Sequence, residues 1–504
     1  MRLRPLFGLT AELLRDSFPG CETVERIVRE HAATVATLAG SSLCACETRF
    51  MVFLPNRKAI VAEQRILNEP LYAAEREPLL GLLRALRRAA SPHNFFALHR
   101  DLLVRYRSRQ EAIDALRRHE DSEKVALKHL TAGSPADRSA VRKQQERLAR
   151  LRTKIAAQQA LQSLLRTVGD GLAWKALGYD RAAITVLGNG TRVDRLTSGE
   201  GLDSELAVLA EYWNRGVFAI HNDLTSCLRH GDVTAIFPGG RREVVEVKAT
   251  QELSPTSPQM RRLRDATTLV NQRRHTFADG TVHALVDLDT PYRTGLSHLR
   301  ALVPKARRTG YASSRVGTCQ MIAVVDNRLT AREPETFLRE HSRALARAGL
   351  GPTGSRESYQ HSTLVRRMRE KKHSFAALAP LSIFPLASED LVDLLLGYLD
   401  LFTALDVTAL GKSFERRGIE VRFAERSERD ELFLEARRIV GDRELFARAG
   451  PTVREQLLLE LMTPANAIAC VEATLDAVEL EPAPQPVARV VALADERRVW
   501  ESAT

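Results

Sequence analysis

The chain has 504 residues, of which 44% are hydrophobic and 27% are charged, and its formal net charge is +11. This composition is that of a folded globular protein, and it excludes an intrinsically disordered one. The positive charge favours a polyanionic partner such as nucleic acid, or an anionic membrane surface. Six cysteines are too few for a disulfide scaffold, so we expect a reducing, cytoplasmic environment.

No segment is expected to enter or cross a membrane. The first residues, MRLRPLFGLTAELLRDSF, reach Glu12 and Asp16 too early for a signal peptide. The most apolar run, LVDLLLGYLDLF at 391–402, is interrupted by Asp393 and Asp400 and is too short to span a bilayer. We expect a buried helix there, and no membrane partner.

The first two regions are expected to be helical. Residues 1–80 mix apolar and charged residues without a clear period, which predicts a mixed or helical N-terminal region. Residues 81–167 form a basic region with helical periodicity. The sequence TAGSPAD at 131–137 breaks that pattern and supplies a fresh N-cap. Residues 81–167 are therefore predicted to form a long antiparallel helical hairpin.

The second helix of this hairpin has two distinct sides. The apolar side carries Leu148, Leu151 and Ile155. The other side carries a basic repeat, which consists of Lys143, Arg147, Arg150 and Lys154. This basic side is suited to a phosphate backbone, but a merely solvated face is the commoner explanation of such a pattern. Self-association of two chains through the hairpin is a further hypothesis.

The next two regions differ in their expected content. Residues 168–330 have an α/β pattern, in which helical segments alternate with short apolar runs such as VTAIF at 233–237 and VHALVDL at 282–288. Residues 331–504 are rich in charged helix formers and are expected to be mainly helical. VARVVALA at 487–494 suits either a strand or a helix.

One predicted β-hairpin, GDVTAIFPGGRREVVEVKAT at 231–250, carries charges within its strands. The Pro-Gly-Gly turn joins two apolar runs. If the turn is centred on Gly239, Asp232 lies directly opposite Glu246, and a turn centred half a residue later makes the pair diagonal. Because Glu246 and Lys248 are two residues apart, they point to the same face.

Two neighbouring carboxylates in a partly buried sheet require either a shared proton or a cation. Oxygen ligands suit a hard divalent ion, Mg²⁺ or Mn²⁺. Such an ion lowers the pKa of bound water, and the compact ammonium of Lys248 would then hold the attacking water. The competing interpretation is a surface hairpin with an ordinary Glu–Lys pair on its polar face.

These residues carry a resemblance to a known superfamily. The spacing of Asp232, Glu246 and Lys248 resembles the PD-(D/E)XK nucleases, also called restriction-endonuclease-like, over about residues 200–330. The resemblance implies a helix, a three-stranded meander, a second helix and a further strand, which is a mixed sheet core flanked by helices. It also implies that Asp232, Glu246 and the Val247 carbonyl bind the metal. Gly231 stands where many members have proline.

Further candidates come from the same resemblance. Many members add a glutamate from the preceding helix, for which Glu211 is preferred over Glu205, and some add a glutamine that Gln259 matches loosely. An ordinary surface role is the alternative for each. The loop residues His221, Asp223, Arg229 and His230 precede Asp232, where they either contact phosphate or form a polar surface.

The sequence therefore predicts a metal-dependent endonuclease that hydrolyses phosphodiester bonds, with DNA as the expected substrate and bacterial defence or DNA processing as the suggested role. This role rests on analogy with the superfamily. One alternative is a non-catalytic nucleic-acid-binding protein on a nuclease-like fold, and another is a helical scaffold that mediates protein contacts. Gly411-Lys412-Ser413 lacks the earlier glycine of a P-loop, so nucleotide binding is not expected.

Overall fold

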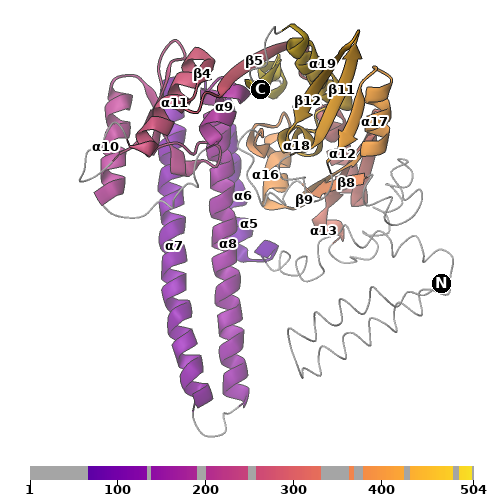
Figure 1. Ribbon diagram of the computed structural model, residues 1–504. Helices are drawn as coiled ribbons and strands as arrows, with labels where there is room; N and C mark the ends of the chain where they lie inside the picture. Colours follow the sequence, from indigo (N-terminus) through magenta and orange to yellow (C-terminus); the bar gives the residue numbers. More distant parts are fainter. Residues whose placement is uncertain are drawn as a thin grey trace, which may run out of the picture.

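The computed structural model describes residues 66–132, 138–189, 200–247, 257–330, 363–367, 378–424, 432–480 and 487–501. Within these residues the chain is a mixed α/β protein in which helices surround several small sheets (Figure 1). The α/β class predicted from the sequence is confirmed. Residues 1–65 and Lys248 lie outside the described part.

The first described elements are helices: α5 (Pro70–Ala74), α6 (Arg76–Arg88), α7 (Pro92–Ala132), α8 (Arg138–Ala176) and α9 (Arg181–Gly188). Helix α6 repeats leucine at helical spacing, and its leucines are buried against the rest of the protein. The Asp180 side chain accepts the Ala183 N–H at 3.0 Å and caps α9.

Helices α7 and α8 form the predicted hairpin, which we call the arm. They contain 41 and 39 residues, so the arm is about 60 Å long at 1.5 Å per residue. Figure 1 shows the two helices side by side, with their far end projecting away from the remainder of the protein. The predicted seam of Leu148, Leu151 and Ile155 is buried, whereas the basic side is exposed.

After the arm and α9, helix α10 (Glu200–Asn214) precedes a three-stranded antiparallel meander. Its strands are β1 (Phe218–His221), β2 (Val233–Ile236) and β3 (Arg242–Val245), with the short helix η1 (Asn222–Leu224) between the first two. Helix α10 packs on β1 and β2, and α11 (Pro258–Gln272) packs on β3. Apolar residues of α10 and the strands, including Leu209, Val217 and Val233, form a small core.

Three further sheets make up the rest of the protein. Strands β6 (Tyr311–Val316), β7 (Gln320–Asp326), β9 (Leu399–Asp406) and β8 (Thr363–Arg367) form one sheet in that order. Strands β13 (Val487–Ala494), β5 (Val282–Pro291) and β4 (Arg274–Thr276) form another, in which β13 and β5 are parallel. Strands β10 (Glu420–Phe423), β11 (Leu434–Val440) and β12 (Arg443–Ala449) form the third.

Helices cover these sheets and connect them. Helix α12 (Leu296–Thr309) packs on β6 and β7, and α19 (Pro464–Leu480) packs on β12 and β5. The remaining elements are α13 (Asn327–Thr330), η2 (Leu381–Ile383), α16 (Ser388–Leu396), α17 (Val407–Glu415), α18 (Pro451–Leu459) and α20 (Glu496–Glu501).

The described part of 331–504 is more mixed than the expected mainly helical region, because it contributes the six strands β8 to β13 beside its helices. The run 391–402 is not one helix: α16 ends at Gly397, whose φ is +77°, and β9 follows. A glycine in the left-handed region ends a helix readily. Strand β9 is buried along almost its whole length, so its residues lack the alternation that marks a strand with one exposed face.

The sheets also cross the boundary expected at residue 330. Strand β7 pairs with β9, and β5 pairs with β13, so strands from both sides of that boundary share two sheets. Residues 168–330 therefore do not form a separate unit. Strand β5 was expected to extend the meander, but it pairs with β13 and β4 instead.

A buried ion network joins several of these parts. Arg181 of α9, which is 2% exposed, donates to both oxygens of Glu460 at 2.8 and 2.7 Å and to both oxygens of Glu496 at 3.0 and 2.8 Å. The Tyr292 hydroxyl also donates to Glu460. The rings of Trp174 and Tyr292 lie 5.1 and 5.5 Å from the guanidinium carbon. This arrangement satisfies a buried cation from α9 with acids from the C-terminal part.

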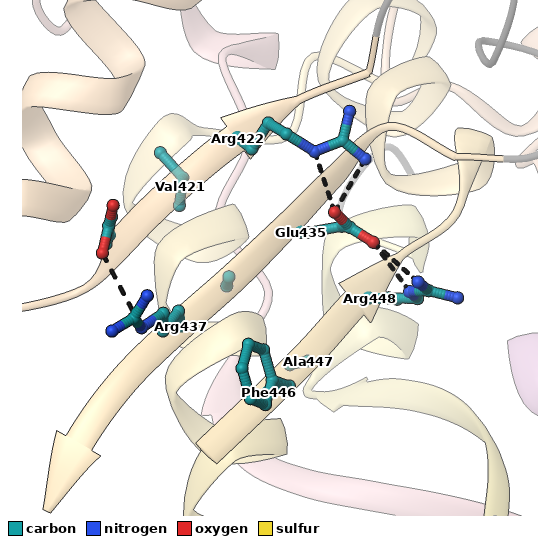
Figure 2. Close-up of a pocket in the computed structure, with 9 residues that line it drawn as sticks. Val421, Arg422, Glu435, Arg437, Phe446, Ala447 and Arg448 are labelled. Atoms are coloured by element: carbon teal, nitrogen blue, oxygen red, sulfur yellow. Dashed lines mark hydrogen bonds and ion pairs between the residues drawn. The ribbon is translucent and has the colours of Figure 1, made fainter. Parts of the chain in front are cut away.

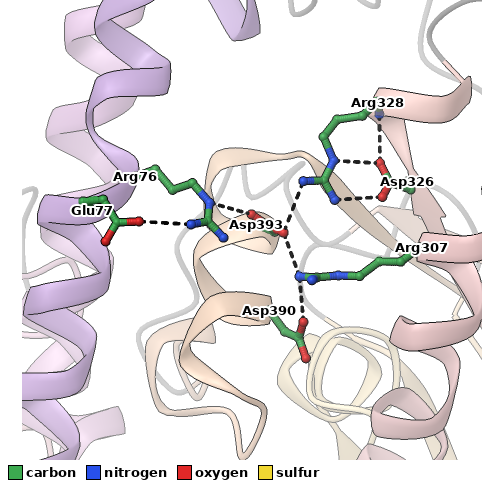
Figure 3. A network of polar contacts seen from close by, with 7 residues as sticks. All are labelled: Arg76, Glu77, Arg307, Asp326, Arg328, Asp390 and Asp393. Atoms are coloured by element: carbon green, nitrogen blue, oxygen red, sulfur yellow. Dashed lines mark hydrogen bonds and ion pairs between the residues drawn. The ribbon is translucent and has the colours of Figure 1, made fainter.

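A second network gathers around Asp393 of α16, which is fully buried (Figure 3). Its carboxylate accepts Arg307 at 2.7 Å and Arg76 at 3.4 Å, and it pairs with Arg328 at 3.6 Å. These three arginines come from α12, α6 and α13. The network therefore joins α16 to α6 and to the two helices α12 and α13.

The Arg181 network generates the first prediction. We expect Arg181→Met to lower the free energy of unfolding by about 3–5 kcal/mol, because it leaves two buried carboxylates without their cation. Arg497→Met is the control, because Arg497 pairs with Glu501 at the surface, where such a pair contributes about 0.3–0.5 kcal/mol. Urea denaturation of both variants measures the difference, and equal losses would contradict the role assigned to Arg181.

Candidate active site

The register of the meander places the two candidate acids. Val233 pairs with Val245 and Ile236 with Arg242, so the hairpin is centred on Gly239, and the ladder ends directly beside Asp232 on one strand and directly beside Glu246 on the other. This is the first of the two registers considered from the sequence. Gly239 and Gly240 adopt φ of +89° and +86°, which glycine adopts without steric cost.

The Asp232 side chain crosses from β2 to the end of β3. Its Oδ2 accepts the Val247 N–H at 2.7 Å, and its own N–H donates to the Val245 carbonyl at 2.8 Å. Gly231, which precedes it, has φ of +62°, and a Cβ there would lie 2.6 Å from the Val245 oxygen. Proline is fixed near φ −65°, so this backbone excludes proline at position 231.

Asn222 holds the chain that leads into Asp232, a role that sequence reasoning missed. It is 1% exposed, and its Nδ2 donates to the carbonyls of His230 and Gly231 at 2.7 and 3.1 Å. Its Oδ1 accepts the Thr234 hydroxyl at 2.9 Å, and its N–H donates to the Asp232 carbonyl at 2.8 Å. Asn222 therefore fixes the backbone on both sides of the candidate catalytic aspartate.

Of the two candidate glutamates on α10, it is Glu205 that reaches the meander. Its Oε2 lies 2.6 Å from Nε2 of His221, which is 1% exposed at the end of β1. Because His221 Nδ1 accepts the Asp223 N–H at 3.3 Å, the ring proton lies on Nε2 and is donated to Glu205. The preferred candidate Glu211 is 70% exposed and pairs with Arg215 at 3.4 Å, so the geometry reverses that preference.

Asp223 is a further acid at this end of the meander. Burial raises its pKa to about 6, and the nearby charges of Glu205 and Asp232 raise it further, while His221 and Arg166 oppose the shift. A carboxyl with such a pKa holds its proton more readily than an exposed aspartate does. The sequence placed Asp223 on the approach to Asp232, and the structure puts it within electrostatic reach of that residue.

The base of the arm holds the connection between β1 and β2. His99 of α7 accepts the His221 N–H at 3.0 Å, and burial lowers the pKa of His99 to about 3, so this imidazole is neutral. From α8, Arg166 donates to the Asp223 carbonyl at 3.2 Å, and Asp170 accepts the N–H groups of Ser226 and Cys227 at 2.5 and 3.0 Å.

The other predicted positions differ in their surroundings. Gln259 is exposed in the first turn of α11. Arg229 donates from Nε to the Ser226 carbonyl at 3.1 Å, which holds it within its own loop. Burial lowers the pKa of His230. Lys248, the candidate that would hold the water, lies outside the described residues.

No group of three or more His, Cys, Asp or Glu side chains suited to a metal ion occurs in the described part of the chain. The donor set implied by the resemblance is smaller, since it consists of the Asp232 and Glu246 carboxylates and the Val247 carbonyl. All three donors are oxygens at adjoining positions of one hairpin, which fits a hard divalent ion. Across the described ranges, no helix is long and apolar enough to span a membrane.

A surface hollow of about 530 Å³ lies elsewhere, on the outer face of the sheet β10–β11–β12 (Figure 2). In it, Arg422 and Arg448 both face Glu435, at 2.7 and 2.8 Å, and lower its pKa. Arg437 pairs with Glu420 and Glu444. The cations of this face are balanced by acids, and none of the candidate site residues lines it.

Comparison with protein-family models, with curated proteins and with solved structures finds no match to this chain.

The contacts of Asn222 generate the second prediction. Asn222→Ala removes three side-chain hydrogen bonds and leaves two carbonyls and a hydroxyl without their partner, so we expect a loss of about 2–4 kcal/mol in the free energy of unfolding. Asn271→Ala is the matched control: Asn271 bonds both backbone groups of Arg242, at 2.9 and 2.8 Å, but in an exposed position. Its loss should stay below about 1 kcal/mol, because water replaces its bonds. Thermal and urea denaturation measure both, and a larger loss for Asn271→Ala would contradict this account.

The pKa of Asp223 generates the third prediction. Between about pH 4 and pH 6 the folded protein keeps a proton that the unfolded chain has released, so this residue lowers stability as the pH rises through that window. Asp223→Asn removes the effect. We expect the variant to be more stable than the wild type by about 1–2 kcal/mol above pH 6, after allowance for solvent screening, and equal to it below about pH 4.

Asp279 provides the control for this pH profile. Hydrogen bonds from Thr281 lower the pKa of Asp279, which is the opposite direction. Asp279→Asn should therefore show no gain in stability over the same window. Parallel urea-denaturation profiles of the wild type and Asp223→Asn from pH 4 to pH 7 would show that burial does not raise the Asp223 pKa.

Proposed function

We propose that this chain is a metal-dependent nuclease that hydrolyses phosphodiester bonds, with DNA as its substrate, at the open end of the β2–β3 hairpin. The observation that carries the proposal is the contact between the two strand ends, where the ladder centred on Gly239 stops beside Asp232 and Glu246 and the Asp232 carboxylate accepts the N–H of Val247 at 2.7 Å. These positions are the ones in which the superfamily resemblance requires its two acids.

Each residue of the hairpin has a defined role in the proposed reaction. The Asp232 and Glu246 carboxylates and the Val247 carbonyl would hold Mg²⁺ or Mn²⁺. When bound, the ion supplies a Lewis acid that lowers the pKa of water and stabilises charge on the phosphate. Lys248, the next residue, would orient the attacking water with its ammonium group. Glu205, held by His221, is the helix glutamate closest to this end of the meander.

The surrounding charge also supports a phosphate substrate. Helix α11 packs on β3 and presents Arg261, Arg262 and Arg264 at its exposed surface. The chain as a whole carries a net charge of +11. Such positive charge draws a polyanion toward the hairpin and increases the rate of encounter.

The alternative is a non-catalytic nucleic-acid-binding protein. One observation favours it: the strand β5, which follows α11 and β4 along the chain, does not join the meander. A residue-specific cleavage assay separates the two functions, because binding alone requires neither the metal nor Lys248.

The fourth prediction concerns the reaction. With Mg²⁺ or Mn²⁺ the wild type should nick supercoiled plasmid DNA and lose this activity in EDTA, and Asp232→Asn and Lys248→Ala should each lower the rate by about 100-fold or more. Two controls make the same chemical changes at exposed positions: Glu211→Gln replaces a carboxylate by an amide, and Lys412→Ala removes a lysine. Both should retain the wild-type rate. A folded wild type that binds DNA but leaves it uncut with either ion would favour the non-catalytic alternative.

A further inference from the structure

We propose that four cations on the arm form a docking surface for the phosphate backbone of duplex DNA, separate from the candidate active site. We call Lys143, Arg147, Arg150 and Lys154 of α8 the arm stripe. All four side chains are exposed. Their spacing of four, three and four residues places them on one side of the helix, over a length of about 16 Å at 1.5 Å per residue.

Several cations of the arm, unlike those of the arm stripe, are paired with acids. Arg142 pairs with Glu146 at 3.1 Å, and Arg152 and Lys124 pair with Glu120 at 3.0 and 3.2 Å. Within the described ranges, no ion pair joins an arm stripe residue to an acid. The stripe is therefore a run of four positive charges on successive turns of one side of α8, none of which is paired with an acid of the described residues.

This arrangement does not serve the stability of the helix. Like charges three or four residues apart destabilise a helix by about 0.2–0.5 kcal/mol for each pair, and the arm stripe contains three such neighbouring pairs. The helix owes its stability to the buried seam of Leu148, Leu151 and Ile155 instead. Packing of the arm does not require these like charges. Binding of a polyanion would explain why the helix carries them in spite of the stability that they cost.

The arm holds the stripe on a stiff support. Gln144 donates to the Glu123 carbonyl of α7 at 3.0 Å, and closer to the base Gln162 donates to Gln110 at 2.9 Å. Arg109 of α7 donates to Gln158 of α8 at 3.1 Å. These bonds hold α8 against α7, so the helix that sets the spacing of the four cations is already in place before any partner binds, which lowers the entropic cost of binding.

The chemistry of the arm favours a duplex over a single strand. Proteins that hold single strands combine positive charge with aromatic side chains on which bases stack. Between residues 107 and 173 the chain has no Phe, Tyr or Trp. A duplex offers phosphates alone to such a surface, at about one charge per 1.7 Å of its axis, so the arm stripe would face an extended row of them.

The test measures binding of a fluorescent 30-base-pair DNA duplex by anisotropy, in EDTA, as a function of salt concentration. The stripe variant combines Lys143→Gln, Arg147→Gln, Arg150→Gln and Lys154→Gln. The control variant removes four other exposed cations of the arm by Arg107→Gln, Arg118→Gln, Lys128→Gln and Arg138→Gln. Both variants lose the same net charge, and glutamine preserves helix propensity.

If each stripe residue contacts one phosphate, the stripe variant should bind about 100-fold or more weakly near 0.1 M salt, and the slope of log K against log salt should fall by about 3–4. The control variant should lose less than about 10-fold. A third variant, Arg147→Lys with Arg150→Lys, keeps the charge and should retain the wild-type slope. Circular dichroism verifies that each arm is helical, and the third variant keeps the test valid if the stripe variant unfolds.

Equal losses in the stripe and control variants would overturn the proposal, because net charge alone would then account for binding. Absence of duplex binding by the wild type at low salt would also overturn it. A single strand or an RNA duplex bound more tightly than duplex DNA would refute the assigned partner. Because EDTA removes the metal, these outcomes are independent of the nuclease activity, which the plasmid assay decides separately.

Discussion

The buried guanidinium of Arg181 is the constraint on which the assembly of the fold depends. A charge that is 2% exposed is tolerated only when acids neutralise it, and here the acids are Glu460 and Glu496. Since α9 comes before the meander and both glutamates come from the C-terminal part, these segments must be assembled together. The parallel pairing of β5 with β13 joins the same two parts of the chain, so the network and the sheet impose one arrangement.

Within this fold, the arm supports the backbone of the candidate site. The meander itself is small, with three strands of four residues each, and its own core contains few buried side chains. The arm supplies further contacts. His99, Arg166 and Asp170 each bond a different residue between the end of β1 and the start of β2. Close packing adds to this, since a Cβ on Gly169 of α8 would lie 2.0 Å from the Leu224 carbonyl oxygen. The backbone that leads to Asp232 is therefore fixed by two helices that lie far from it in sequence.

The sequence was sufficient for features that local periodicity determines. The arm followed from the seam of Leu148, Leu151 and Ile155, and the turn centred on Gly239 was one of the two registers that the sequence left open for β2 and β3. The C-terminal strands were missed because β9 is buried almost throughout and reads like an apolar helix. The partner of β5 was also out of reach, since β13 lies about 200 residues further along and no local pattern encodes a long-range pairing.

Within the candidate site, the sequence could predict interactions between residues close together in the chain, but not those that depend on how distant elements pack. Asp232 and Glu246 could be proposed together from the sequence because both lie in one hairpin. The choice between Glu205 and Glu211 depends on the rotation of α10 against the sheet, which the helix sequence alone does not set. Asn222 had a readable signal, since a polar residue directly after a buried strand is well placed to bond a neighbouring turn.

The acids at the end of the meander each have a hydrogen-bond donor or a charge partner from the protein itself. Asp232 accepts the Val247 N–H, Glu205 accepts His221, and the Asp223 carboxyl lies near Arg166 and keeps its proton more readily than usual. Repulsion between carboxylates is therefore limited without a cation, and the meander can fold before any ion arrives. An ion that bound Asp232 and Glu246 would then add to a preformed backbone, because Asn222 and Gly231 have already set the position of Asp232.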